Sequence, residues 1–257
     1  MHLLAAERIK LLSTRAPWAC ALLALAVTAG FAALVAGGGS ESKDLPTVAT
    51  TQFGYRFGLA VVLTLAALTV TTEYRTGTIH TTFQAVPRRA PALVAKAAVV
   101  AGFAFALGEV AAFGSWVACL VVAPPGADLA LDSAADWTIL AGTGAVYALG
   151  AVAAVGVGLL IEHSAGAVAV CVLYPLAVED LIGAIPEVGE PVHRWLPFNA
   201  ATKFLSGTGG ASGGRSGGNA NILSDSPLPQ PWALAYFAVF ALVVLGAGVL
   251  SARRRDA

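Results

Sequence analysis

Long apolar runs alternate with short polar segments along the whole chain. A helix needs about 20 apolar residues to cross the hydrocarbon core of a bilayer, and six runs come close to or exceed that length. The pattern therefore predicts six transmembrane helices in one domain, residues 1–257. They are expected at about residues 18–37, 55–72, 93–122, 138–161, 165–185 and 232–250. The first run exceeds the 7 to 15 residues usual for a cleavable signal core, so we expect it to remain as a helix.

The composition agrees with this pattern and excludes an ordinary soluble domain. Of the 257 residues, 57% are hydrophobic and 12% are charged, whereas about a quarter of the residues in soluble domains are charged. The mean hydropathy is +0.76. The fold class expected from the sequence is thus an all-α polytopic membrane protein, placed in the plasma membrane.

The positive charges predict the orientation of the helices, because loops on the cytoplasmic side carry an excess of Lys and Arg. The formal net charge is zero, yet ten of the fifteen Lys and Arg residues fall on one side of the predicted topology. These ten are Arg8, Lys10, Arg15, Arg75, Arg88, Arg89, Lys96, Arg253, Arg254 and Arg255. Six crossings put both termini on that same side, so we expect both to be cytoplasmic. The segments 73–90 and 186–230 are then a cytoplasmic loop and a long outer segment.

The sequence offers little that is typical of an enzyme. The segment from Gly209 to Ser216 resembles a phosphate-binding loop, but it lacks the flanking strand and helix that such a loop requires. The pairs Glu162–His163 and Glu179–Asp180 fall at span ends, where solvated charges are common, and no third metal ligand stands at a set spacing. The three cysteines lie within apolar runs. We therefore expect no catalytic residues, no metal and no cofactor in this chain.

Glu109 is the acidic residue that lies well inside a predicted span. A carboxylate at the centre of a transmembrane helix costs about 2.5 to 3.5 kcal/mol on insertion scales, so it should face a cavity or a polar partner, or be protonated. A role in a substrate path or a proton relay is one reading. A structural hydrogen bond, or a position nearer to the outer interface, is the other.

The polar stretch from Glu73 to Arg89 is a candidate docking element. A helix that breaks at Gly77 and stops at Pro87 would lie along the membrane surface. An apolar face through Ile79, Phe83 and Val86 favours docking, whereas an ordinary cytoplasmic loop held by positive charges would not need that face. From the residues alone, both readings stay open.

The motif in this stretch resembles the first cytoplasmic loop of ABC-2 type transporter permeases. The resemblance is carried by Glu73, by Gly77-Thr78, and by Pro87-Arg88-Arg89. It extends to the opening of the chain, with Glu7, Lys10-Leu11, Ser13-Thr14-Arg15 and Pro17-Trp18, and to Leu196-Pro197-Phe198-Asn199 in the outer segment. The glycine-rich part of that segment, residues 207–218, departs from the family pattern.

The resemblance implies a mechanism. In that family two six-span permease subunits pair, and each presses an interfacial coupling helix between spans 2 and 3 into a separate ATP-binding subunit. Glu73, Gly77, Thr78 and Pro87 would match the docking motif, and Arg75, Arg88 and Arg89 would touch the ATPase or lipid headgroups. ATP and Mg²⁺ would be bound by the partner ATPase, and nucleic acid would play no part.

The expected function is therefore the permease subunit of an ATP-driven exporter of a hydrophobic or amphipathic compound. A proton-coupled secondary transporter that uses Glu109 is the first alternative, although the first three spans and the last three show no inverted repeat. A membrane sensor or immunity protein, which would keep the docking loop but move no substrate, is the second.

Overall fold

The computed structural model describes residues 2–38, 46–78, 89–206 and 224–255. Within these ranges the fold is helical, with one isolated β-bridge between Thr47 and Asp128. Six helical stretches of the described chain are long and apolar enough to cross a membrane, so the six apolar helices expected from the sequence are present and the chain is a multi-pass membrane protein. They are α2 (Ala16–Gly38), α3 (Tyr55–Thr76), α5 (Arg89–Val122), α6 (Ala134–Ile161), the composite helix of α7 (Ser164–Leu173), η2 (Tyr174–Val178) and α8 (Glu179–Gly183), and α11 (Gln230–Arg255).

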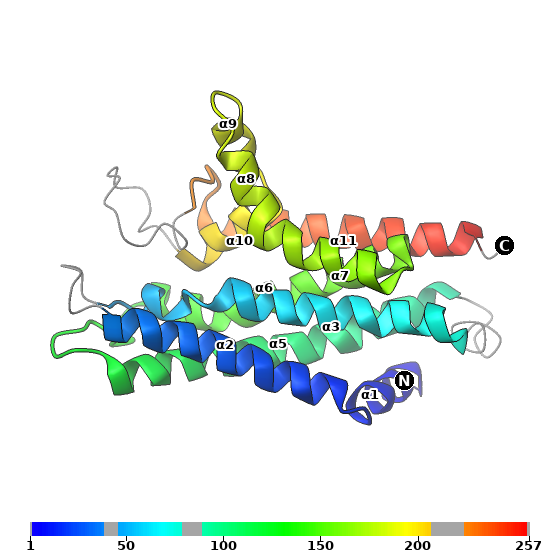
Figure 1. Cartoon of the computed structure of the whole chain (residues 1–257), viewed down its shortest axis with the longest axis horizontal. Coiled ribbons are helices and arrows are strands. Elements are labelled where there is room, and N and C mark those ends of the chain that lie inside the picture. Colours follow the sequence, from blue (N-terminus) through cyan, green and yellow to red (C-terminus); the bar gives the residue numbers. More distant parts are fainter. Residues whose placement is uncertain (1, 39–45, 79–88, 207–223, 256–257) are drawn as a thin grey trace.

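Helix α6 is at the centre of the bundle and packs against α3, α5 and α11 (Figure 1). Its buried face includes Tyr147, whose hydroxyl donates a hydrogen bond of 2.9 Å to the carbonyl of Tyr55 on α3. A capping box at Ser133 and Asp136 begins the helix. Residue 162 ends it with a left-handed conformation, φ +59°. The sequence thus sets both ends of this central helix.

Small residues allow the close approach of α6 to its neighbours. A Cβ at Gly150 would lie 3.0 Å from Leu59 of α3, and one at Gly158 would lie 3.1 Å from the Ala67 carbonyl of the same helix. A Cβ at Gly156 would lie 2.6 Å from the backbone of α11. Close backbone approach through small residues is a common way for helices to associate in lipid. The small residues that the sequence places in this span therefore pack within the chain.

The fifth span is a composite helix because of Pro175. Proline has no backbone N–H and its ring collides with the carbonyl one turn earlier, which an unbroken α-helix cannot accommodate. The turn from Tyr174 to Val178 takes the wider π form, and this relieves the clash. The span then continues as α8 to Gly183.

The two ends of the bundle differ in construction. Both chain termini lie at one end, beside the C-terminal end of α3 (Figure 1); we call this the α1 end, after the short helix α1 (His2–Leu12). At the other end, which we call the α10 end, the outer segment forms α9 (Gly189–His193) and α10 (Pro197–Ser206). Residues 207–223, which contain the whole glycine-rich stretch, lie outside the described ranges.

Helix α10 is packed into the bundle. Phe198, Phe204 and Leu205 are buried, while Trp195 lies before the helix and is exposed. The ring of Phe204 lies so close to Gly142 of α6 that a Cβ there would be 2.5 Å from it. The Tyr55 hydroxyl also lies 2.5 Å from the Thr202 hydroxyl, which ties α3 to α10.

Candidate functional site

The predicted docking motif begins inside helix α3. We expected the span to end at Thr72, but α3 continues through Glu73 and Arg75 to Thr76. It ends at Gly77, where φ is +71° and the backbone N–H donates to the Tyr74 carbonyl. Such a left-handed C-cap favours glycine because that residue has no Cβ to clash. The predicted helix break at Gly77 is thus present.

Glu73 lies in a cluster of four charged side chains that we call the ion cluster, formed by Glu7, Lys10, Glu73 and Lys96. The Lys96 Nζ donates to the Glu7 Oε2 at 2.6 Å and to the Glu73 Oε1 at 2.8 Å. The Lys10 ammonium donates to the same oxygen of Glu73. The residues come from α1, α3 and α5, so the cluster joins the N-terminal helix to the ends of two spans.

The centre of the ion cluster is buried and its edge is open. The side chains of Glu73 and Lys96 are only 7% and 6% exposed, whereas that of Lys10 is 45% exposed. Removing one partner from a buried ion pair leaves an uncompensated charge and is strongly destabilising. An exposed pair contributes about 0 to 1 kcal/mol. The Lys96 contacts are therefore the structural part of the cluster, and the Lys10 contact can be broken at low cost.

The other residues of the predicted docking motif surround this end of α3. Arg75 is exposed on the last turn of the helix, and the Thr78 hydroxyl lies 3.0 Å from that of Thr76. Arg89 is the first residue of α5. Pro87 and Arg88 lie outside the described ranges, as do the residues of the predicted apolar face, so the coupling helix itself is not described.

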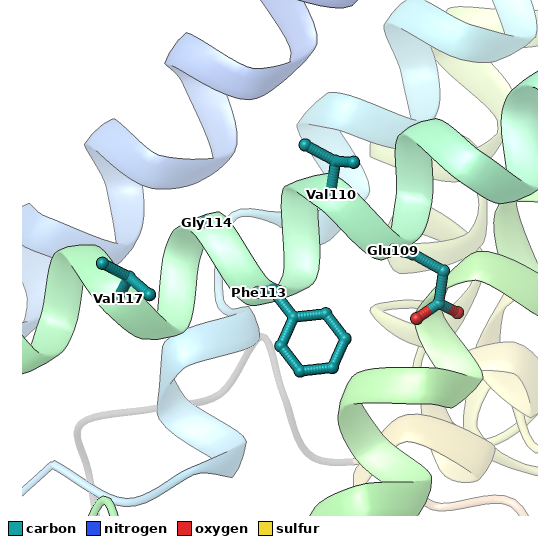
Figure 2. A pocket seen from close by; sticks show the side chains of 5 residues that line it. All are labelled: Glu109, Val110, Phe113, Gly114 and Val117. Atoms are coloured by element: carbon teal, nitrogen blue, oxygen red, sulfur yellow. The ribbon is translucent and has the colours of Figure 1, made fainter.

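Glu109 lies on α5 at a shallow, mostly apolar groove of about 460 Å³ (Figure 2). The side chains of Glu109 and Phe113 point the same way from the helix, and Val110, Gly114 and Val117 complete the lining of the groove (Figure 2). The Oε1 atom of Glu109 is buried against Gly144 of α6 and has no hydrogen-bond partner in the described part of the chain. The carboxyl group thus lies at a groove, as one reading of the sequence required, with the backbone of Gly144 beside it.

Sequence reasoning missed the role of Glu179. We expected Glu179 and Asp180 to be solvated together at a span end, which is wrong for Glu179, since its residue exposure is 0%. Its carboxylate accepts the backbone N–H of Phe198 at 3.0 Å and that of Asn199 at 2.8 Å, and so caps α10. Asp180 points away and pairs with Arg56 at 3.2 Å. Consecutive helical residues project about 100° apart, which is why one carboxylate is inside and its neighbour outside.

The Glu162–His163 pair has a local role at the turn after α6. The His163 Nδ1 accepts the backbone N–H of Gly166 at 3.4 Å and is the N-cap of α7, directly after the left-handed residue Glu162. Within the described ranges, no three His, Cys, Asp or Glu side chains come together as a metal site would require. The arrangement is that of a turn between two spans.

The fold and the charged end of α3 define a multi-pass helical membrane protein with an ion cluster at one end of its bundle. No protein-family model matches the chain, and no curated protein matches it.

Proposed function

We propose that this chain is the permease subunit of an ABC-2 type transporter, which exports a hydrophobic or amphipathic compound from the plasma membrane. A separate ATP-binding subunit would dock on the loop between α3 and α5 at the α1 end, which is then cytoplasmic. A second permease subunit would complete the path through the bilayer. The proposal rests on the loop motif and on the ion cluster beside it.

The ion cluster is the main support for the proposal, because it joins α1, α3 and α5 beside the loop. A docking loop can drive a membrane domain only if its displacement reaches the spans. Glu73 and Lys96 lie on either side of this loop, near the end of α3 and within the first turns of α5, and are bonded to each other at 2.8 Å. Glu7 and Lys10 extend the bonded group to α1. A push on the loop would therefore move α1, α3 and α5 together.

The test is co-purification of the full chain with the candidate ATP-binding subunit in mild detergent. Arg75→Glu reverses an exposed charge beside the docking loop, and Arg194→Glu reverses one that is 46% exposed at the α10 end. We expect Arg75→Glu to lower the amount of bound ATPase at least tenfold and Arg194→Glu to leave it unchanged. Equal binding by the wild type and both variants would remove the docking role, as would failure of the wild type to bind an ATPase.

A second candidate function, proton-coupled transport, is favoured by the position of the Glu109 carboxyl group at its groove inside α5. A carboxyl group inside a transmembrane span is a common proton carrier. Glu109→Gln removes the titrating group but keeps the shape of the side chain. Loss of substrate movement driven by a pH gradient in this variant, without any ATPase present, would select the second candidate.

A further inference from the structure

A cavity of about 430 Å³ lies between α1, α2, α3 and α5 at the α1 end. The ion cluster forms its charged end. The rest of the wall is largely apolar and includes Leu11, Pro17, Leu65, Leu68 and Val100. A volume of this size is within the range of ligand sites, which combine apolar walls with a few polar groups.

The cavity has a structural cause in the way α2 meets α3. Near the α10 end these helices are in close contact, because a Cβ at Gly54 would lie 2.8 Å from the Thr28 carbonyl. The rings of Phe31 and Phe57 stack there with centroids 4.4 Å apart. Toward the α1 end, Pro17 and Cys20 of α2 line the cavity instead. The two helices therefore diverge toward the ion cluster and leave the cavity between them.

The depth of the cavity matches one leaflet of a bilayer. Its wall on α3 runs from Leu65 to Thr76, which is about 16 Å along a helix with a rise of 1.5 Å per residue. One leaflet accounts for about half of the ~30 Å hydrocarbon core. The charged end lies at the helix end and the apolar end points toward the bilayer centre, which is the polarity of a lipid molecule.

The charges of the ion cluster select the kind of headgroup. The cluster holds two ammonium groups and two carboxylates, so its formal charge is zero, and both signs line the cavity. A purely anionic headgroup would meet two carboxylates, and an uncharged one would displace solvent from charged groups without replacing its hydrogen bonds. A zwitterion satisfies both signs, with its phosphate on the half-exposed Lys10 and its ammonium on a carboxylate.

We propose that this cavity binds one zwitterionic phospholipid from the leaflet at the α1 end. Its headgroup lies on the ion cluster and one acyl chain runs along α3 toward Leu65. The bound lipid fills the space under α1 and completes the packing of α1 against the spans. This site does not depend on the transport function proposed above, and its test requires no ATPase.

The test is native mass spectrometry of the full chain in detergent after addition of one lipid at a time. The lipids are phosphatidylethanolamine, phosphatidylglycerol and diacylglycerol with identical acyl chains. We expect one phosphatidylethanolamine to be retained under conditions that remove the other two, with at least tenfold higher occupancy. Equal retention of phosphatidylglycerol or diacylglycerol would overturn the zwitterionic assignment.

Two substitutions locate the site. Leu68→Trp fills the cavity from α3, and we expect it to lower phosphatidylethanolamine occupancy at least tenfold. Val243→Trp places the same ring at a position of α11 that is 63% exposed, and should leave occupancy unchanged. Val99→Phe fills the cavity from α5 and carries the test if Leu68→Trp does not fold. Unchanged occupancy in a folded cavity variant would overturn the site.

Discussion

The capping of α10 by Glu179 gives the sharpest prediction for stability. Glu179→Ala removes a fully buried carboxylate that accepts the backbone N–H groups of Phe198 and Asn199 at 3.0 and 2.8 Å. Both donors belong to the first turn of α10, where no intrahelical acceptor is available to them. The variant therefore leaves two donors without their partner in the protein interior.

The magnitude follows from these two donors. A buried donor left unsatisfied costs about 1 to 3 kcal/mol, so two cost about 2 to 6 kcal/mol. Removing the carboxylate also removes the cost of burying its charge, which is several kcal/mol and offsets part of that loss. We expect a net destabilisation of about 3 kcal/mol for Glu179→Ala. Glu179→Gln keeps one acceptor oxygen and the side-chain volume, and should lose about half as much.

Thermal unfolding of the purified chain in detergent, followed by tryptophan fluorescence, measures this loss. For a chain of about this size, 1 kcal/mol corresponds to about 2 to 4 °C in Tm, so Glu179→Ala should lower Tm by about 6 to 12 °C. Asp180→Ala is the matched control, because it removes the neighbouring carboxylate, which is 49% exposed and forms a partly exposed ion pair with Arg56, whose own side chain is 13% exposed. Such pairs contribute about 0 to 1 kcal/mol. A Tm loss for Asp180→Ala as large as that for Glu179→Ala would refute the capping argument.

Two further predictions concern the α1 end and the contact of α2 with α3. Lys96→Met leaves the buried Glu73 without its buried cation and should cost about 3 kcal/mol. Lys10→Met removes a half-exposed partner and should cost under about 1 kcal/mol. The difference in Tm between the two variants measures this, and equal losses of Tm would contradict the prediction. Gly58→Ala places a Cβ against side chains of α2 and α6 and should cost about 1 to 3 kcal/mol. Gly30→Ala, where nothing lies within 4 Å of the new atom, should be neutral or slightly stabilising in the same assay. A comparable loss of Tm in both glycine variants would show that the close packing around Gly58 is not the cause.

The sequence predicts the helical spans well because span length is a property of each segment alone. An apolar run must form a helix in lipid, where its backbone groups have no water to bond, and its ends can be read from where the apolar residues stop. The end of α3 is the informative exception. The helix runs four residues past Thr72 because Glu73 finds two lysines from other elements, and these partners are far away in the sequence.

Partners that are distant in the sequence also explain why the contacts of the candidate site could not be predicted. The pair Glu179–Asp180 looks like two equivalent charges, and its separation into a cap and a surface ion pair depends on where α10 packs. Lys96 could be read from the sequence as an interfacial residue, but its bonds to Glu7 and Glu73 span 89 and 23 residues of chain. A charged residue next to the end of an apolar run is the sequence signal that could have pointed to both, since such a residue must find a partner if it is buried.

The two buried carboxylates near the ends of the bundle indicate which end can rearrange. Glu179 is held by backbone N–H groups within one packed unit, so breaking its contacts requires α10 to leave the bundle. Glu73 is held by side-chain ammonium groups from two separate elements, and one of them, Lys10, is half exposed and can exchange its carboxylate for water or a headgroup. In the proposed transport cycle, motion would therefore begin at the α1 end, where the Lys10 contact can be broken at low cost while the Lys96 contacts keep α1, α3 and α5 together. The α10 end would remain the fixed point about which α3, some 30 Å long at 1.5 Å per residue, tilts.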